Sequence, residues 1–95
     1  MPAYLSATIR VKDPAKLKEY ISSLPATMAP FGAKLVYRAK VNKALLGDAA
    51  YHIQAVFEFQ SAEDVESWWG SEAYQALAPI RNAACDGDVV ILDSM

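Results

Sequence analysis

The sequence predicts an α+β fold in which a four-stranded antiparallel sheet carries all its helices on one face. Two observations lead to this prediction. The order strand, helix, strand occurs twice along the 95 residues. The strand segments alternate apolar with polar residues, whereas the helical segments repeat their apolar residues about every 3.6 positions. This βαββαβ order is the ferredoxin-like arrangement, and we expect residues 1–95 to form a single domain of this kind.

The first half supplies a strand, a helix and a second strand. Residues 3–11, "AYLSATIRV", alternate as a half-buried strand does. Asp13 is placed as an N-cap and Pro14 as a first-turn proline, and apolar residues follow at helical spacing as far as Gly32. Pro25 is expected to kink or divide this helix because it lacks a backbone donor. Residues 34–40, "KLVYRAK", are predicted to form the second strand.

The second half repeats that order after a loop with a turn at Gly47 and Asp48. Residues 51–59, "YHIQAVFEF", are predicted to form the third strand. Ser61 caps a helix that ends at Gly70, and Ser71 caps another that is expected to run past Pro79 towards Gly87. The last predicted strand covers residues 89–93.

The sheet face without helices is a candidate interface. If the more apolar parity of each strand faces the helices, the other parity is a mixture of apolar and polar residues. We expect a second copy of the chain to pack on it as a homodimer; the alternative is a solvated face. The predicted open-face residues are Tyr4, Ser6, Thr8, Lys34, Val36, Arg38, His52, Gln54, Val56, Glu58, Val90 and Leu92.

Glu58 is expected on the open face although it lies between two phenylalanines, and Arg38 is expected to reach it from a neighbouring strand. The favoured interpretation is a cross-strand or intersubunit ion pair. The functional alternative makes Glu58 or His52 a catalytic proton acceptor and Arg38 an anion clamp. His52 alone is weak evidence for catalysis, since a lone histidine is more often a packing residue.

Arg81 is predicted on the apolar face of the last helix, where an unpaired guanidinium would be costly. The favoured interpretation pairs it with a carboxylate, for which Asp86, Asp88 and Glu58 are the candidates. The alternative is a small substrate-binding pocket in which Arg81 lies beside Tyr74 and the tryptophans, Trp68 among them.

Composition excludes several classes of function. With nine basic and eleven acidic residues and no basic cluster, the chain lacks the positive surface that nucleic acid requires. No apolar run is long enough to span a bilayer, so we expect no membrane partner and a cytoplasmic location. Cys85 has no partner for an internal disulfide and is expected to pack in the core, and one histidine and one cysteine make a metal site improbable.

The segments "ATIRVKDPAKLKEY", "FGAKLVYRAK", "LLGD", "FEFQSAEDVESWWGSEAYQALAPIR" and "GDVVILD" together resemble the domain of unknown function 1330 family, a branch of the dimeric α+β barrel superfamily. The resemblance covers nearly the whole chain. It implies a ferredoxin-like protomer whose sheet packs against its twin to form a barrel-like dimer. The recurrent polar positions of the family fall on Arg38, Glu58, Tyr74 and Arg81. Members often carry two glycines after the strand arginine, where this chain has Ala39 and Lys40.

Two functions follow from these observations. The first is a homodimer that binds or transforms a compact metabolite, anionic or carbonyl-bearing, in a pocket without a bound cofactor. Its candidate residues are Glu58 and His52 for catalysis and Arg38, Tyr74, Arg81 and Trp68 for substrate binding. The alternative is a non-catalytic accessory or interaction module whose buried charges are structural.

Overall fold

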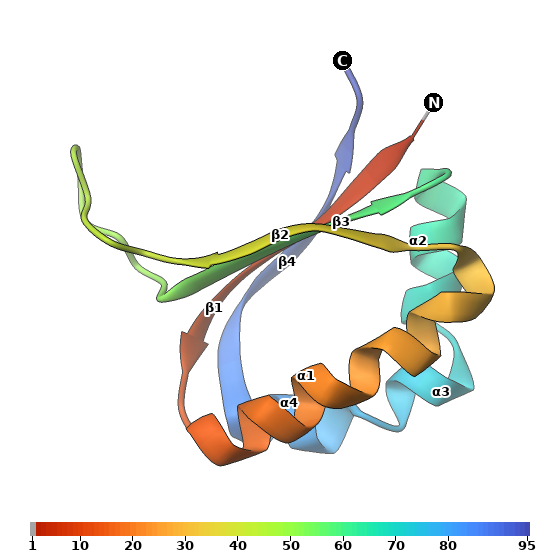
Figure 1. Cartoon of the computed structure of the whole chain (residues 1–95), viewed down its shortest axis with the longest axis horizontal. Coiled ribbons are helices and arrows are strands. Elements are labelled where there is room, and N and C mark those ends of the chain that lie inside the picture. The colour runs from red at the N-terminus through yellow and green to blue at the C-terminus, as the bar shows by residue number, and fades with distance from the viewer. Residues whose placement is uncertain (1) are drawn as a thin grey trace.

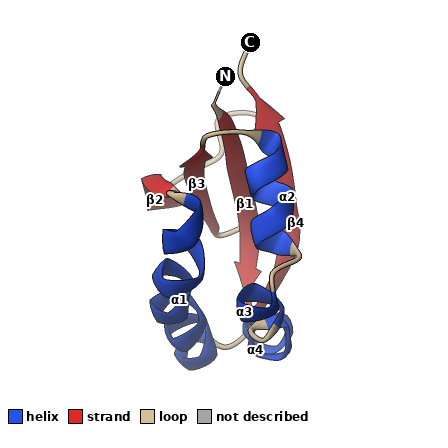
Figure 2. Ribbon diagram, turned by 90° about the vertical axis from the view of Figure 1, so that its right-hand side faces the viewer, coloured by secondary structure: helices blue, strands red, loops and turns tan. Residues whose placement is uncertain are grey.

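The computed structural model describes residues 2–95, which form an antiparallel sheet covered by helices on one side. The strands stand in the order β2-β3-β1-β4, with bounds β1 (Ala3–Val11), β2 (Lys34–Lys40), β3 (Ile53–Phe59) and β4 (Cys85–Asp93). Between the strands run α1 (Pro14–Met28), the short 3-10 helix η1 (Ala29–Phe31), α2 (Ala62–Trp69), α3 (Glu72–Gln75) and α4 (Ala78–Ala84). Figures 1 and 2 show every helix on the same face of the sheet. The predicted ferredoxin-like α+β fold is confirmed.

Local chemistry sets the ends of the helices. The Asp13 side chain accepts hydrogen bonds from the backbone N–H groups of Ala15 and Lys16, and Pro14 occupies the first turn of α1. The Ser61 and Ser71 side chains each accept one backbone N–H at the start of α2 and α3. At the other end of the first helical segment, Gly32 adopts a left-handed conformation with φ 66° and stops the chain from continuing as a helix.

Several predicted boundaries differ from the structure. α1 is not divided at Pro25 but continues to Met28. The long helix expected after Ser71 is two short helices, and β4 begins at Cys85 instead of residue 89. β3 begins at Ile53, two residues later than predicted.

The register of β2 contains a bulge that corrects the predicted position of Arg38. Leu35 pairs with Phe57 and Tyr37 with Val56, so Val36 is an extra residue between two consecutive partners. The extra residue reverses the alternation of the following side chains. Arg38 therefore pairs with Ala55 on the helix-covered face. The prediction that Arg38 lies on the open face is wrong.

The main core lies between the sheet and the helices at one end of the molecule. Trp68, Tyr74, Phe59 and Val65 are almost completely buried there, together with Leu5, Leu24 and Met28. A second, smaller cluster joins Leu17 of α1 with Ala84 and Cys85. Cys85 packs in a core as predicted, but as the first residue of a strand and not on a helix. Burial raises the pKa of its thiol.

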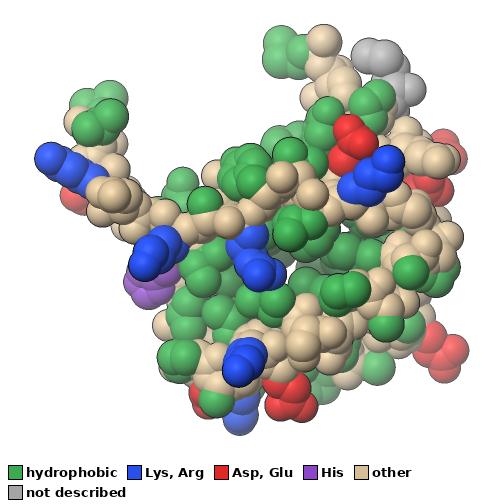
Figure 3. Space-filling view, in the orientation of Figure 1, with side chains coloured by type: hydrophobic (Ala, Val, Ile, Leu, Met, Phe, Trp, Pro, Cys, Tyr) green, Lys and Arg blue, Asp and Glu red, His purple; other side chains and the backbone are tan. Residues whose placement is uncertain are grey.

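The edges of the sheet and one long connection are strongly exposed. All residues of β2, and those of β4 after Cys85, are solvent-exposed in the single chain. Between β2 and β3 the chain forms an arm that projects from the sheet (Figure 1). Hydrophobic side chains lie at its tip (Figure 3), where Leu45 is 93% and Leu46 97% exposed. No helix among residues 2–95 has the length and hydropathy to cross a membrane.

Candidate functional site

A cavity of about 490 Å³ lies between the helix-covered face of the sheet and α1. Its floor is formed by side chains that β1 and β3 direct toward the helices, namely Leu5, Ala7, Ile9, Ile53, Ala55 and Phe57. Leu17, Ile21 and Leu24 of α1 lie across from this floor. The small side chains of Ala7 and Ala55, which pair with each other in the centre of the sheet, leave room that larger residues would fill. The space-filling view shows hydrophobic side chains around a hollow between the sheet and α1 (Figure 3).

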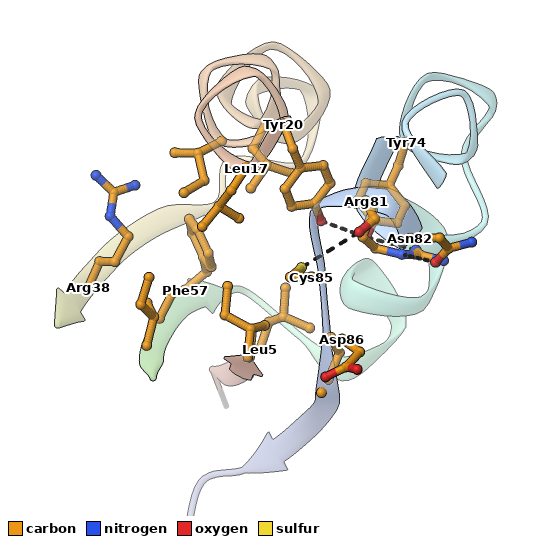
Figure 4. Close-up of a pocket in the computed structure, with 18 of the residues that line it drawn as sticks. Leu5, Leu17, Tyr20, Arg38, Phe57, Tyr74, Arg81, Asn82, Cys85 and Asp86 are labelled. Carbon is orange, nitrogen blue, oxygen red and sulfur yellow. Dashed lines mark hydrogen bonds between the residues drawn. The ribbon is translucent and has the colours of Figure 1, made fainter. Parts of the chain in front are cut away.

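Polar side chains gather at one end of this cavity, where α1, α3 and α4 meet. The hydroxyl oxygens of Tyr20 and Tyr74 are 2.8 Å apart. Arg81 donates from Nη1 to the Tyr74 hydroxyl at 3.0 Å and from Nε to Asn82 Oδ1 at 3.3 Å. Figure 4 shows this group on the opposite side of the cavity from Arg38. The site therefore combines apolar walls with a short hydrogen-bond chain at one end.

Aromatic rings surround the guanidinium of Arg81. Its Cζ atom lies 5.0 Å from the ring centre of Trp69 and 5.6 Å from that of Tyr74. Such cation–π contacts stabilise a partly desolvated cation. Trp68 packs beneath, 4.2 Å from Tyr74 between ring centres, and its Nε1–H donates to Thr27 Oγ1 at 3.0 Å. The tryptophan and tyrosine rings thus hold Arg81 in place.

The expected carboxylate partner of Arg81 is not there. Among residues 2–95, the ion pair in the structure joins Arg10 Nε to Asp86 Oδ1 at 2.7 Å, so Asp86 is engaged elsewhere. The favoured interpretation of Arg81 as half of an ion pair is therefore wrong. Arg81 instead has the neighbours that the alternative interpretation predicts, because it lines a pocket together with Tyr74, Trp68 and Trp69.

Arg38 lines the same cavity from the other side. It is an exposed residue, and it also borders a second, more open hollow beside α1 that Lys18 and Lys40 line. The two hollows share Leu17 and Ile21. Arg38 therefore lies at the rim through which the cavity continues toward solvent.

Glu58 and His52 do not line the cavity. Glu58 stands opposite Tyr4 and Lys34 in the sheet register, on the open face, so it cannot pair with Arg38 on the covered face. The predicted ion pair between Arg38 and Glu58 is wrong for the single chain. His52 Nδ1 accepts a hydrogen bond from the Val11 N–H at 3.1 Å and ties the start of β3 to the end of β1. The role of either residue as a proton acceptor stays a prediction, and for Glu58 it would apply to the open face.

Tyr20 of α1 lines the cavity, although it is not among the site residues that the sequence predicts. A phenol at such a position is predicted to be core because its ring is apolar. The feature that could indicate a polar role is its hydroxyl group, which needs a hydrogen-bond partner when the ring is buried. The partner, Tyr74, is 54 residues away, and only the fold brings the two together.

Within residues 2–95, no three His, Cys, Asp or Glu side chains come close enough together to hold a metal ion.

Solved structures of similar fold include proteins of unknown function and one oxygenase. The RPA0582 protein of unknown function from Rhodopseudomonas palustris is 16% identical, with a TM-score of 0.83 over 99% of this chain and 82% of that one. SnoaB, a cofactor-independent oxygenase from Streptomyces nogalater, is 9% identical, with a TM-score of 0.72 over 99% and 93%. A dimeric ferredoxin-like protein of unknown function from Jannaschia is 13% identical, with a TM-score of 0.71 over 99% and 100%.

Sequence comparison gives a match at the level of the family. No curated protein sequence matches the chain. The family model described as "Domain of unknown function (DUF1330)" matches residues 2–95.

Proposed function

Because the chain belongs to the DUF1330 family, whose description contains no activity, we propose from the geometry that it binds a small, mainly apolar molecule in the cavity between the sheet and α1. The observation that carries this proposal is the cavity of about 490 Å³, which has apolar walls and a polar group at one end. Ligand pockets commonly have this size and this combination of surfaces.

The two ends of the cavity are proposed to contact different parts of the ligand. Tyr74, Arg81 and Trp68 form the polar and aromatic end. Arg38 lies at the rim, and its guanidinium, which has no hydrogen-bond or ion-pair partner among residues 2–95, is available for a polar substituent of the ligand. The SnoaB neighbour is an oxygenase that needs no cofactor, which leads us to include transformation of the ligand without a bound cofactor in the proposal.

We further propose that the functional unit is a homodimer that packs through the open sheet face. On that face Tyr37, Val90 and Leu92 are 44%, 46% and 45% exposed in the single chain. Burial of such side chains is the main driving force for association. Several neighbours of similar fold are dimeric, which supports this assembly, and the apolar tip of the arm offers a second contact. The cytoplasm remains the proposed location.

The non-catalytic alternative remains a second candidate because of one observation. Arg81 is engaged by Tyr74, Asn82 and two aromatic rings without any ligand, as a purely structural cation would be. Native mass spectrometry of freshly purified protein separates the two functions. A dimer that retains a small molecule supports the binding function, whereas a bare dimer that takes up no apolar probe supports the accessory module.

The cavity itself is tested with the neutral fluorophore N-phenyl-1-naphthylamine, which brightens in apolar sites. Wild-type protein is expected to bind it, and Ala7→Phe to weaken binding at least tenfold because the new ring occupies the cavity floor. Ala55→Leu is a milder version should Ala7→Phe fail to fold. Ala26→Phe, on the exposed side of α1, is the matched control and should bind as wild type does. Unchanged binding by both folded cavity variants would refute the proposed site.

A further inference from the structure

The hydroxyl group of Tyr20 is the last polar group before the apolar part of the cavity. Its ring comes from α1, between the cavity residues Leu17 and Leu24, and Figure 4 shows its oxygen directed toward the middle of the pocket. On the far side of that oxygen lie Tyr74 and then Arg81. Tyr20 is thus placed to meet a ligand that fills the cavity.

The direction of the hydrogen bonds can be worked out from the groups involved. A guanidinium only donates, so the Tyr74 oxygen must accept from Arg81 Nη1 at 3.0 Å. Tyr74 is only 1% exposed, and the other partner of its hydroxyl is the Tyr20 oxygen at 2.8 Å. If Tyr20 donated to Tyr74, the buried Tyr74 proton would have no acceptor, which is costly. The favourable arrangement runs from Arg81 to Tyr74 to Tyr20.

This arrangement leaves the proton of the Tyr20 hydroxyl free. The charge of Arg81, two hydrogen bonds away, polarises the Tyr20 hydroxyl. Such a polarised donor makes a stronger hydrogen bond than an isolated phenol does. We propose that Tyr20 binds a carbonyl oxygen on an otherwise apolar ligand, with Tyr74 and Arg81 as positioning residues behind it. This inference rests on the proposed function, since it specifies the ligand class of the same cavity.

Two observations favour a neutral carbonyl over an anion. Burial raises the pKa of Tyr20 although the charge of Arg81 opposes this, so the phenol keeps its proton. The surface next to it is mostly aliphatic, and an anion held there would lose its hydration without a free cation directly against it, because Arg81 already donates to Tyr74 and Asn82.

The experiment compares two probes that differ in one oxygen, 2-acetylnaphthalene and 2-ethylnaphthalene, by calorimetric titration of the full chain. The quantity measured is the ratio of the two affinities. In Tyr20→Phe this preference for the ketone is expected to fall about tenfold, which is the upper end of the worth of one hydrogen bond between neutral groups. Affinity for 2-ethylnaphthalene is expected to stay within about threefold, since phenylalanine keeps the ring. Tyr51→Phe removes a phenol outside the cavity and should leave the ratio unchanged.

The outcomes are distinguishable. A wild-type ratio that persists in folded Tyr20→Phe overturns the inference while the proposed cavity function stands. If 2-naphthoate binds wild type more than tenfold tighter than the ketone, the assignment of a neutral ligand is overturned. If the wild-type protein binds neither neutral probe, the proposed function itself fails. A smaller loss of the ratio in Tyr74→Phe, about threefold, supports the part of the relay that runs through Tyr74.

Discussion

At the scale of single residues, Arg81 shows how a cation is held on a mostly buried helix face without a carboxylate. The Tyr74 hydroxyl, the Asn82 amide and the face of Trp69 take the place of a charged partner. The planar guanidinium suits this environment because it donates in its plane and stacks above it. A lysine at this position would keep the charge, but it would lose the paired N–H donors of the guanidinium and the stacking of its plane on Trp69.

Trp68 and Thr27 form a buried hydrogen bond whose loss is predicted to be expensive. Thr27→Val removes the acceptor for the Trp68 Nε1–H and leaves that donor buried without a partner. We expect the free energy of unfolding to fall by about 1–3 kcal/mol, measured by urea denaturation. Thr27→Ser keeps the hydroxyl and is the matched control, with a smaller loss from the missing methyl group. Equal losses in the two variants would show that packing, and not the hydrogen bond, determines the effect.

At the scale of elements, the strands that sequence predicts best are those with regular alternation. β1 and β2 have the predicted bounds, because apolar and polar residues alternate along β1 and the β-branched and aromatic residues of β2 are bounded by turn residues. The bulge at Val36 has no such signal: no glycine or proline marks it. A regular two-residue alternation therefore predicts the ends of β2 correctly but assigns Arg38 to the wrong face of the sheet, because it does not include the bulge.

β4 illustrates the opposite error, a strand longer than its composition suggests. Its first residues, "CDGD", include aspartates and a glycine, which are poor strand formers, and prediction began the strand only at residue 89. In the structure they pair with β1 from Thr8 to Val11. Long-range pairing overrides local preference here, and no single-sequence pattern reveals it. The proximity of Tyr74 and Arg81 was predicted from one continuous helix. In the structure the two residues lie on the separate helices α3 and α4, and Arg81 Nη1 still reaches the Tyr74 hydroxyl at 3.0 Å.

The pairing between the start of β4 and the end of β1 requires glycine at position 87. Gly87 has φ 148°, and a Cβ atom there would lie 2.0 Å from the Thr8 carbonyl oxygen. Gly87→Ala is expected to reduce the free energy of unfolding by about 2 kcal/mol or more, through both strain and displacement of β1. Gly47→Ala is the comparison, because its φ of 72° is also positive but nothing lies within 4 Å of the added carbon. It should cost only about 1 kcal/mol. Similar thermal denaturation curves for the two variants would contradict this account.

At the scale of the whole molecule, the sheet has one face covered by helices and one face free. The covered face contains the cavity, and the free face carries Glu58 together with exposed apolar residues of the edge strands. A small domain of this kind buries a limited share of its surface by itself. A second copy on the free face would bury more without closing the cavity, so the proposed ligand binding and the proposed assembly would use different sides of the sheet.

Leu92 tests that separation. It lies on the free face opposite Tyr4 and is 45% exposed in the single chain. Leu92→Lys is expected to shift the protein from dimer to monomer in size-exclusion chromatography with light scattering, because a charge would be buried at the interface. Ala83→Lys, on the exposed side of α4, should leave the dimer intact. A Leu92→Lys protein that stays dimeric would place the interface elsewhere.

The bulge at Val36 determines on which face of the sheet the charge of Arg38 lies. A regular strand that kept Val36 would place Arg38 opposite Gln54 on the free face, whereas a chain without Val36 would pair regularly and still hold Arg38 opposite Ala55 on the covered face. One unpaired residue in an edge strand thus assigns a positive charge to the side of the sheet proposed for the ligand instead of the side proposed for a second copy.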